Sequence, residues 1–256
     1  MAGSWQWLVD DEVRIGVTTS RRERTTSTVV ISGKEALLID PGWDPDELAW
    51  IADDLAAAGI VVTAGFGTHA HHDHLLWHPG LGAAPRWASV ATTHRAGADL
   101  SALIQALGPG WPVGLAPLVG QVTEVTGSSV PWDGPTVELI THDAHAKGHT
   151  ALWIPSAATL IAGDMLSDVE LPLLEDSSPA DYADGLTALR PCVEQARVVI
   201  PGHGRPAVSN AAARARWTAD KRYLAALVGG TDPADPRQLL PGMREAHAHN
   251  SSRVAR

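Results

Sequence analysis

Short apolar runs along the chain alternate with segments in which apolar residues recur at helical spacing. The runs at 28–31 and 36–39 are rich in aliphatic and β-branched residues and are separated by a turn signal, which predicts a β-hairpin. Over residues 44–58 the apolar positions recur every three or four residues behind Asp44, which predicts a capped amphipathic helix. A further apolar run at 60–64 predicts a buried strand.

The region from residue 78 to residue 134 interrupts this order, because prolines break its pattern around one expected helix at 96–107. Beyond it we expect helices at 179–189 and 211–227. The remaining expected strands are short apolar runs with β-forming residues, at 137–141, 151–154, 159–162 and 198–200. Strands in groups with interspersed helices indicate sheets covered by helices.

The length and apolar content of the chain limit how many domains it can form. A chain of 256 residues that is 45% hydrophobic can bury a sizeable core. We predict one domain over residues 1–230, which includes the last expected helix. Residues 231–256 are rich in Pro and Asp and then in His, Asn and Ser, and we predict that they form a partly flexible tail of loops.

Charge and hydropathy limit the kinds of partner and the cellular compartment that we expect for the protein. The chain has 19 basic and 29 acidic side chains and a net charge of -10, so it lacks a basic field for nucleic-acid phosphates, and we expect no nucleic-acid partner. We find neither a signal-peptide pattern nor an apolar run of the ~18 residues that suggest a spanning helix, so we expect a cytoplasmic protein without a membrane partner. The single cysteine, Cys192, agrees with a reducing compartment. The oligomeric state is not defined by the sequence.

A dense cluster of histidine and aspartate follows the strand expected at 60–64. Residues 69–74 read HAHHDH. Imidazole nitrogen and carboxylate oxygen are ligands of zinc and similar metals, and a catalytic site needs several of them around a point with one position left open. In an extended segment His69 and His71 point to the same side, whereas Asp73 and His74 turn toward a neighbouring point if a helix begins there. This one segment is therefore suited to two adjacent metal ions.

Residues 68–74 resemble the signature of the metallo-β-lactamase superfamily, and three further matches to that family follow in the expected order. His149, in a Gly-His-Thr context, looks like the third histidine of the family. Asp164, in Ala-Gly-Asp, looks like its bridging aspartate, and His203, in Pro-Gly-His-Gly, looks like its last ligand. The similarity spans about residues 28–204. It implies an α/β fold, a four-layer αββα sandwich.

The resemblance also implies which residues hold metal. The implied ligands are His69, His71 and His149 for a first ion, Asp73, His74 and His203 for a second, and Asp164 between them. We expect two zinc ions, although iron and manganese accept the same ligand types. Asp40 matches a family aspartate that orients the ligands by hydrogen bonds, and a turn-forming aspartate before Pro-Gly explains it equally well. His142 and His145 lie close to His149 in sequence, and only the Gly-His-Thr context selects His149.

The implied activity is metal-dependent hydrolysis. Two metal ions can supply a bridging hydroxide near neutral pH, with Asp73 orienting it and accepting its proton. Several true β-lactamases of the superfamily have cysteine, or no bridging carboxylate, where Asp164 stands. We therefore expect a zinc-dependent enzyme that cleaves an ester, thioester or lactone-type bond. The alternatives are a phosphodiesterase, an iron enzyme acting on persulfides or oxygen, and a member of the fold that binds without catalysis.

The expected partner is a small-molecule substrate. The region after His203 does not resemble the glutathione-binding helical domain of the glyoxalase II branch. The candidates for substrate contact flank the metal motifs, and they are Trp77, His78, Lys147 and Arg205.

Overall fold

The structure, a computed structural model, describes residues 3–254; residues 1–2 and 255–256, at the ends of the two predicted ranges, lie outside the described residues. The chain divides into two compact units. The first runs to Leu139 and includes Ile154–Ala157, and the second comprises Ile140–Trp153 and the chain from Ala158. That residues 1–230 form a single domain stays a prediction.

The first unit contains a sheet whose strands follow one another in chain order. Its strands are β1 (Gln6–Asp10), β2 (Val13–Thr19), β3 (Thr26–Ser32), β4 (Glu35–Ile39), β5 (Val61–Phe66), β6 (Arg86–Ala88) and β7 (Thr123–Glu124). Neighbours from β1 to β4 are antiparallel, and neighbours from β4 to β7 are parallel. The hairpin and the strand predicted at 60–64 are confirmed as β3 with β4 and as β5. The mostly exposed strand β1, and β2 beside it, were not predicted.

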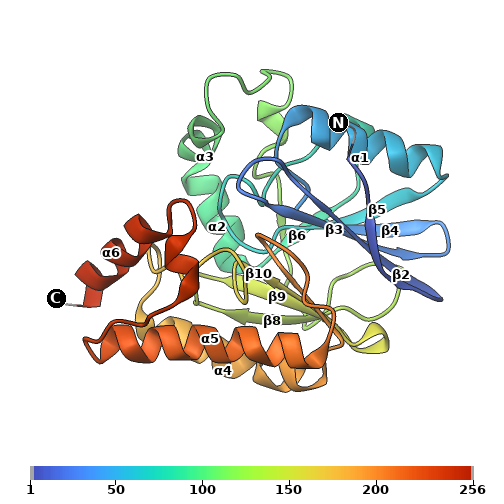
Figure 1. Cartoon of the computed structure of the whole chain (residues 1–256). Helices are drawn as coiled ribbons and strands as arrows, with labels where there is room; N and C mark the ends of the chain where they lie inside the picture. The colour runs from blue at the N-terminus through green and yellow to red at the C-terminus, as the bar shows by residue number, and fades with distance from the viewer. Residues whose placement is uncertain (1–2, 255–256) are drawn as a thin grey trace. The chain divides into compact units, whose positions relative to one another are not determined.

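Helix α1 (Pro45–Ala57) covers part of this sheet (Figure 1). Asp44 and Glu47 form a capping box at its start, as reciprocal hydrogen bonds at a helix N-terminus require, and Ile51 and Leu55 join the core formed with β3 and β4. The single helix predicted at 96–107 is instead two helices that meet at Asp99. The other helical elements of the unit are α2 (Val90–Ala98), α3 (Leu100–Ala106), and the 3-10 turns η1 (Pro79–Leu81), η2 (Ala116–Leu118) and η3 (Pro155–Ala157).

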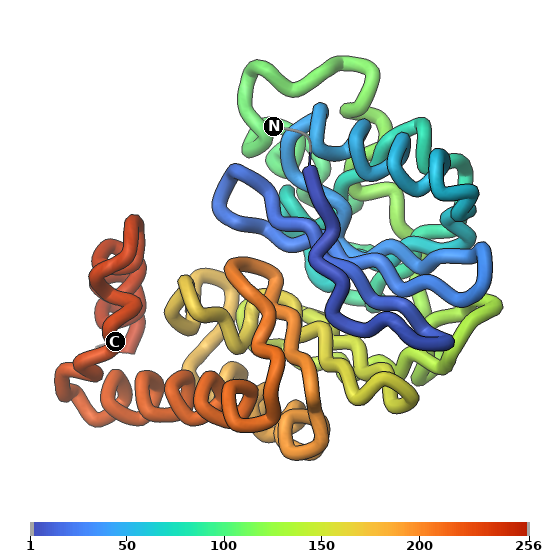
Figure 2. Tube along the Cα trace, turned by 45° about the vertical axis from the view of Figure 1, so that its right-hand side comes forward, coloured from blue at the N-terminus to red at the C-terminus, as the bar shows by residue number. Residues whose placement is uncertain are grey.

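The second sheet has the strand order β11-β10-β9-β8, and β10 and β11 are parallel. Its strands are β8 (Glu138–His142), β9 (His149–Ile154), β10 (Thr159–Gly163) and β11 (Val198–Pro201), which confirm the four strands predicted in this part of the chain. Helices α4 (Pro179–Gln195) and α5 (Asn210–Val228) lie side by side in both views (Figures 1 and 2). Their apolar residues, among them Leu186 and Leu224, form one core with Leu160 and Val199 of the sheet.

The C-terminal segment contains the 3-10 turn η4 (Pro236–Leu239) and helix α6 (Met243–Val254). Figure 2 shows α6, in red, turning back from the end of α5. The prediction that this segment consists of loops is therefore wrong over α6. Buried Asn250 anchors the helix: it donates to the carbonyl of Pro172 at 2.7 Å and to the hydroxyl of Tyr223 at 3.0 Å, and it accepts from the amide of Leu174. A polar anchor of this kind leaves no apolar periodicity in the sequence.

Among the described residues, no helix combines the length and the hydropathy that crossing a bilayer requires.

Candidate metal centre

In the first unit, the ends of two parallel strands place the histidine-rich segment beside Asp40. Asp40 follows β4 and residues 68–74 follow β5, and parallel neighbours bring their carboxyl ends to one edge of the sheet. Asp40 accepts hydrogen bonds from the amide of Thr68 at 2.8 Å and from its hydroxyl at 2.7 Å. It also lies 2.9 Å from Nδ1 of His74. Asp40 thus ties the start of the segment to its end.

These contacts fix which nitrogen of two histidines carries the proton. The hydroxyl of Thr68 has one proton, which it donates to Asp40, so it must accept a proton from Nδ1 of His69, 3.0 Å away. His74 donates from Nδ1 to Asp40 in the same way. When neutral, both rings therefore have their lone pair on Nε2. Both side chains are buried, with at most 1% exposed.

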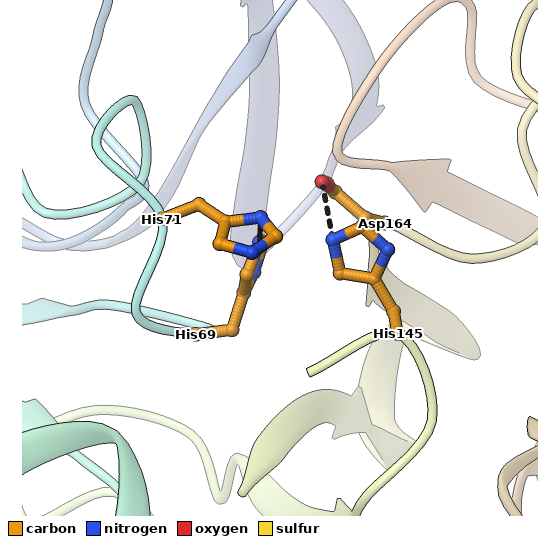
Figure 3. A group of neighbouring side chains, drawn as sticks. All are labelled: His69, His71, His145 and Asp164. Atoms are coloured by element: carbon orange, nitrogen blue, oxygen red, sulfur yellow. Dashed lines mark hydrogen bonds and ion pairs between the residues drawn. The ribbon is translucent and has the colours of Figure 1, made fainter. Parts of the chain in front are cut away.

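The remaining donors of this segment lie beside those two nitrogens. Nε2 of His69 is 2.9 Å from Nδ1 of His71, a contact drawn in Figure 3. Nε2 of His74 is 3.3 Å from Oδ2 of Asp73, an oxygen that also accepts a hydrogen bond from the hydroxyl of Thr25 at 2.9 Å. The segment forms a turn after His71 rather than the start of a helix. The segment still presents two pairs of potential ligand atoms. They are Nε2 of His69 with Nδ1 of His71, and Nε2 of His74 with Oδ2 of Asp73.

In the second unit, Asp164 follows β10 and His203 follows the parallel strand β11, so both lie at one edge of that sheet. Nε2 of His203 is 3.3 Å from Oδ2 of Asp164. The backbone approaches closely at Gly202, where an added Cβ would stand 1.9 Å from Oδ1 of Asp164. Only glycine fits there without displacing the carboxylate.

Of the two histidines nearest Asp164, His145 rather than His149 faces its carboxylate. Nε2 of His145 lies 3.2 Å from Oδ2 of Asp164, and the side chain of His145 is 3% exposed. Figure 3 draws this contact as a dashed line. His149, at the start of β9, instead accepts a hydrogen bond at Nε2 from the backbone amide of Asp164 at 3.1 Å. The contacts within the second unit favour His145 for the ligand position, and the choice of His149 stays a prediction.

Oδ2 of Asp164 is consequently shared between two imidazoles. Both Nε2 atoms, of His145 and of His203, face this one oxygen from within 3.3 Å. An oxygen in this position is suited to bridging two cations, as the resemblance implied for Asp164.

His142 stacks on the ring of His149, with centroids 4.9 Å apart. Its Nδ1 accepts a hydrogen bond from the amide of Ala144, and its buried Nε2 has no hydrogen-bond partner among the described residues. Burial lowers the pKa of His142 to about 4, against the opposing charge of Asp143. His142 is therefore a neutral packing partner of His149 at neutral pH.

The four residues predicted to contact substrate have structural roles or face solvent. Trp77 is buried in the core of the first unit, and its indole donates to the carbonyl of Gly82. His78 caps η1 by accepting from the amide of Gly80. Lys147 is exposed, and Arg205 lies on the exposed side of its loop. Substrate contact by these residues stays a prediction, and core packing alone accounts for Trp77.

The donor set of each unit fits divalent metal ions. Imidazole nitrogens and carboxylate oxygens suit zinc, iron and manganese. Burying such groups is costly unless a cation or hydrogen bonds satisfy them. In each unit buried imidazole nitrogens lie 3.2–3.3 Å from carboxylate oxygens, an arrangement that a bound cation would stabilise.

Comparison with known proteins agrees with this donor set. The profile of the metallo-β-lactamase superfamily matches residues 21–203, which is most of the chain. The chain belongs to the metallo-β-lactamase superfamily.

Two curated relatives are named hydroxyacylglutathione hydrolase. The protein of Synechococcus sp. (strain JA-3-3Ab) is 29% identical over 156 residues, and that of Thermosynechococcus vestitus (strain NIES-2133 / IAM M-273 / BP-1) is 27% identical over 160 residues. Each match covers 60% of this chain and 55% of the relative. The chain thus matches about half the length of these relatives.

Solved structures with similar folds include metallo-β-lactamases. The enzyme FIM-1 from Pseudomonas aeruginosa, in its mono-zinc form, aligns with a TM-score of 0.63 at 15% identity over 88% of this chain and 97% of its own. The DIM-1 metallo-β-lactamase aligns with a TM-score of 0.62 at 16% identity over 85% of this chain and 96% of its own. These similarities confirm the predicted metallo-β-lactamase fold.

Proposed function

We propose that this protein is a metal-dependent hydrolase that cleaves small-molecule thioesters and related esters and lactones. The observation that carries the proposal is the shared oxygen of Asp164, because a carboxylate oxygen that faces two imidazoles is suited to holding divalent metal, which can supply a hydroxide for hydrolysis. The relatives named hydroxyacylglutathione hydrolases support a thioester as the substrate class. A cytoplasmic location and a small-molecule partner remain part of the proposal.

The assignment of ligands follows the family pattern and the geometry within each unit. Within the first unit we assign His69, His71, Asp73 and His74 as metal ligands, and within the second unit His145, Asp164 and His203. We propose zinc as the metal, and iron and manganese are the alternatives to test. When bound, such ions make water acidic enough to supply hydroxide near neutral pH and polarise the substrate carbonyl.

The residues of the chain then have distinct tasks. Asp73, held by the hydroxyl of Thr25, would orient the attacking water and accept its proton. Asp40 and Thr68 would keep the Nδ1–H tautomers of His74 and His69. His149 would hold the backbone of Asp164 in place.

The experiment that tests this proposal compares metal forms and substrates in one panel. Metal-free protein, prepared with a chelator, is reloaded with zinc, manganese or iron and assayed against acyl thioesters of glutathione and of coenzyme A, lactones, carboxylic esters, phosphodiesters and persulfides. Oxygen consumption is recorded in parallel. We expect metal-dependent hydrolysis of thioesters.

One aspartate variant tests the mechanism in this panel, and a second aspartate variant is its control. Asp73→Asn should lower kcat by about 10²-fold or more, because proton transfer by a positioned group contributes that much. Asp184→Asn makes the same change on the exposed side of α4 and should leave kcat unchanged. Hydrolysis only of phosphodiesters, or oxygen-dependent turnover only, would contradict the proposed substrate class.

A further inference from the structure

His203 lies between two carboxylates of the second unit. Its Nε2 faces Oδ2 of Asp164 at 3.3 Å, and its Nδ1 faces Oε1 of Glu170 at 3.8 Å. The side chain of His203 is 7% exposed and that of Glu170 is 16% exposed. One ligand atom from each of the three side chains lies within 4.8 Å of the others. Glu170 has no part in the ligand set proposed above.

The same arrangement occurs around His74 in the first unit. There Nε2 faces Oδ2 of Asp73 at 3.3 Å, and Nδ1 pairs with Oδ2 of Asp40 at 2.9 Å. A carboxylate on the far nitrogen of a histidine ligand fixes the tautomer and orientation of the ring and raises its basicity. Glu170 thus lies on the same side of His203 as Asp40 does of His74, at the longer distance of an ion pair rather than of a hydrogen bond.

We propose that Glu170 is a positioning residue for His203 and that a buried ion-pair network in the C-terminal part of the chain sets its place. This inference rests on the proposed function, since it assigns the support of one of the proposed ligands. Glu170 keeps the proton of His203 on Nδ1, so that Nε2 presents its lone pair beside Asp164.

The loop that carries Glu170 is tied directly to the segment that carries His203. The hydroxyl of Ser167 donates to the carbonyl of His203 at 2.8 Å and accepts from the amide of Glu170 at 3.0 Å. Asp168 accepts from the amide of Arg205 at 2.8 Å. Gly204 has a φ of +101°, and an added Cβ there would stand 2.2 Å from Oδ1 of Asp168. The loop that carries Glu170 therefore packs closely against the segment that carries His203.

Arg237 holds the same loop from the C-terminal side. Its guanidinium donates to the carbonyl of Ser167 at 3.1 Å and to that of Glu170 at 2.8 Å. It also pairs with Asp220 of α5 at 2.7 Å and with Asp235 at 2.8 Å. Asp220 is 1% exposed and Arg237 is 7% exposed. The planar fork of arginine matches several fixed acceptors at once, which an ammonium group does not.

Asp220 also contacts the start of this loop. Its second oxygen accepts from the amide of Leu166 at 3.2 Å. Removing one partner of a buried charge pair leaves the other uncompensated, so the network resists rearrangement. The ends of residues 166–170 are thus bonded to one buried cluster of charges. This explains how a loop can hold Glu170 at a defined place beside His203.

Zinc affinity tests the inference without any substrate. Glu170→Gln keeps the length of the side chain and removes its charge, and Glu175→Gln makes the same change at an exposed position a few residues along the chain. The zinc dissociation constants of the wild type and both variants are measured by competition with a chromophoric chelator. We expect Glu170→Gln to weaken the binding of one of two zinc ions by about 10- to 100-fold, the usual effect of losing such a support. Glu175→Gln should match the wild type.

The tautomer of His203 is a second readout that a merely structural role would not change. In two-bond 1H–15N NMR spectra of the zinc-free protein near pH 8, His203 should carry its proton on Nδ1 in the wild type, and this preference should weaken in Glu170→Gln. Glu170→Asp should recover part of the zinc affinity. Equal zinc affinity and tautomer in Glu170→Gln and Glu175→Gln would overturn the inference. Complete loss of one zinc ion from Glu170→Gln would overturn it too, because Glu170 would then be a ligand.

Arg237→Lys tests the network by the same measurement. It keeps the positive charge and loses the fork, so zinc binding should weaken in the same direction. The double variant with Glu170→Gln should bind zinc no more weakly than Glu170→Gln alone, since both changes act through one carboxylate. Fully additive losses would overturn the role of Arg237. A wild type that binds two zinc ions and hydrolyses nothing in the panel would contradict the proposed function and leave this inference intact.

Discussion

Replacement of Asp40 by asparagine should weaken both folding and metal binding, although it alters only one atom of the side chain. Asp40 accepts three hydrogen bonds: Oδ1 receives the amide of Thr68, and Oδ2 receives the hydroxyl of Thr68 and Nδ1 of His74. Its φ is +48°, in the left-handed region that asparagine tolerates as well as aspartate. Asp40→Asn therefore adds no backbone strain and isolates the loss of the carboxylate.

The magnitude follows from these contacts. The bond to the amide of Thr68 persists on the retained oxygen, whereas the new NH2 group faces two donors that formerly met a carboxylate. A hydrogen bond to a charged group contributes about 1.5–3 kcal/mol. Partial repair by rotation of the Thr68 hydroxyl and a tautomer switch of His74 reduces the summed loss to roughly 2–4 kcal/mol by the same scale. For a chain of this size that is a fall of roughly 4–16 °C in the unfolding midpoint.

The tautomer switch predicts the effect on metal binding. If His74 moves its proton to Nε2 to accept a bond at Nδ1, it loses the lone pair that faces Asp73, and zinc affinity should fall by about 10- to 100-fold. Calorimetry of the metal-free protein and zinc competition measure the two effects separately. Asp53→Asn, an exposed change on α1, is the matched control. Surface substitutions usually change the free energy of unfolding by no more than about 0.5 kcal/mol. This account of Asp40 would be refuted if Asp40→Asn stayed within that range of the control and within threefold of its zinc affinity.

Three further outcomes are expected. His145→Ala should remove about one zinc ion per chain, whereas His149→Ala should retain both ions with weaker binding, because His149 acts through the backbone of Asp164; the opposite pattern in metal analysis would restore the assignment to His149. Burial lowers the pKa of His142 in the folded protein to about 4. As the pH falls below about 6.5, the unfolded chain therefore binds a proton at His142 before the folded protein does. The free energy of unfolding of the metal-free protein should fall by up to about 3 kcal/mol between pH 6.5 and 4. His142→Phe should flatten that part of the pH profile in denaturant titrations, and an unchanged slope would argue against a buried neutral His142. Chelation of the metal should lower the unfolding midpoint of the wild type, and an unaltered midpoint would show that metal does not bind the folded state preferentially.

The parts of the site that the sequence predicted are those in which neighbouring residues carry the signal. His69, His71, Asp73 and His74 lie in one short segment, so their spacing alone indicates metal binding. Their orientation depends on contacts with residues far away in the chain. Thr25, which holds Asp73, is 48 positions away, and nothing in its sequence context indicates that role.

The two histidines near Asp164 show where local sequence context leaves a choice open. Both His145 and His149 lie within a few residues of each other, and a Gly-His-Thr pattern favoured the second. The decisive contact is a hydrogen bond from the backbone of Asp164, fifteen residues later, which occupies Nε2 of His149. Such a bond depends on how two strands come together, and periodicity does not record it.

The fold was predicted best where helices and strands bury apolar residues with a clear period. Helix α1 and strands β3–β5 have this pattern. Helix α6 does not, because the bonds of Asn250 hold it in place rather than an apolar stripe. The break at Asp99 between α2 and α3 also escaped prediction, since both helices have apolar positions that continue one plausible period.

Titration of the metal-free protein with zinc, with the rate of thioester hydrolysis recorded at each addition, tests the central claim most directly. The account predicts negligible hydrolysis without metal and a rate that rises to a plateau at about two zinc ions per chain. Asp164 should be essential to that stoichiometry, because its shared oxygen faces both His145 and His203. A rate that is independent of added zinc, or a protein that binds no metal at all, would contradict the account.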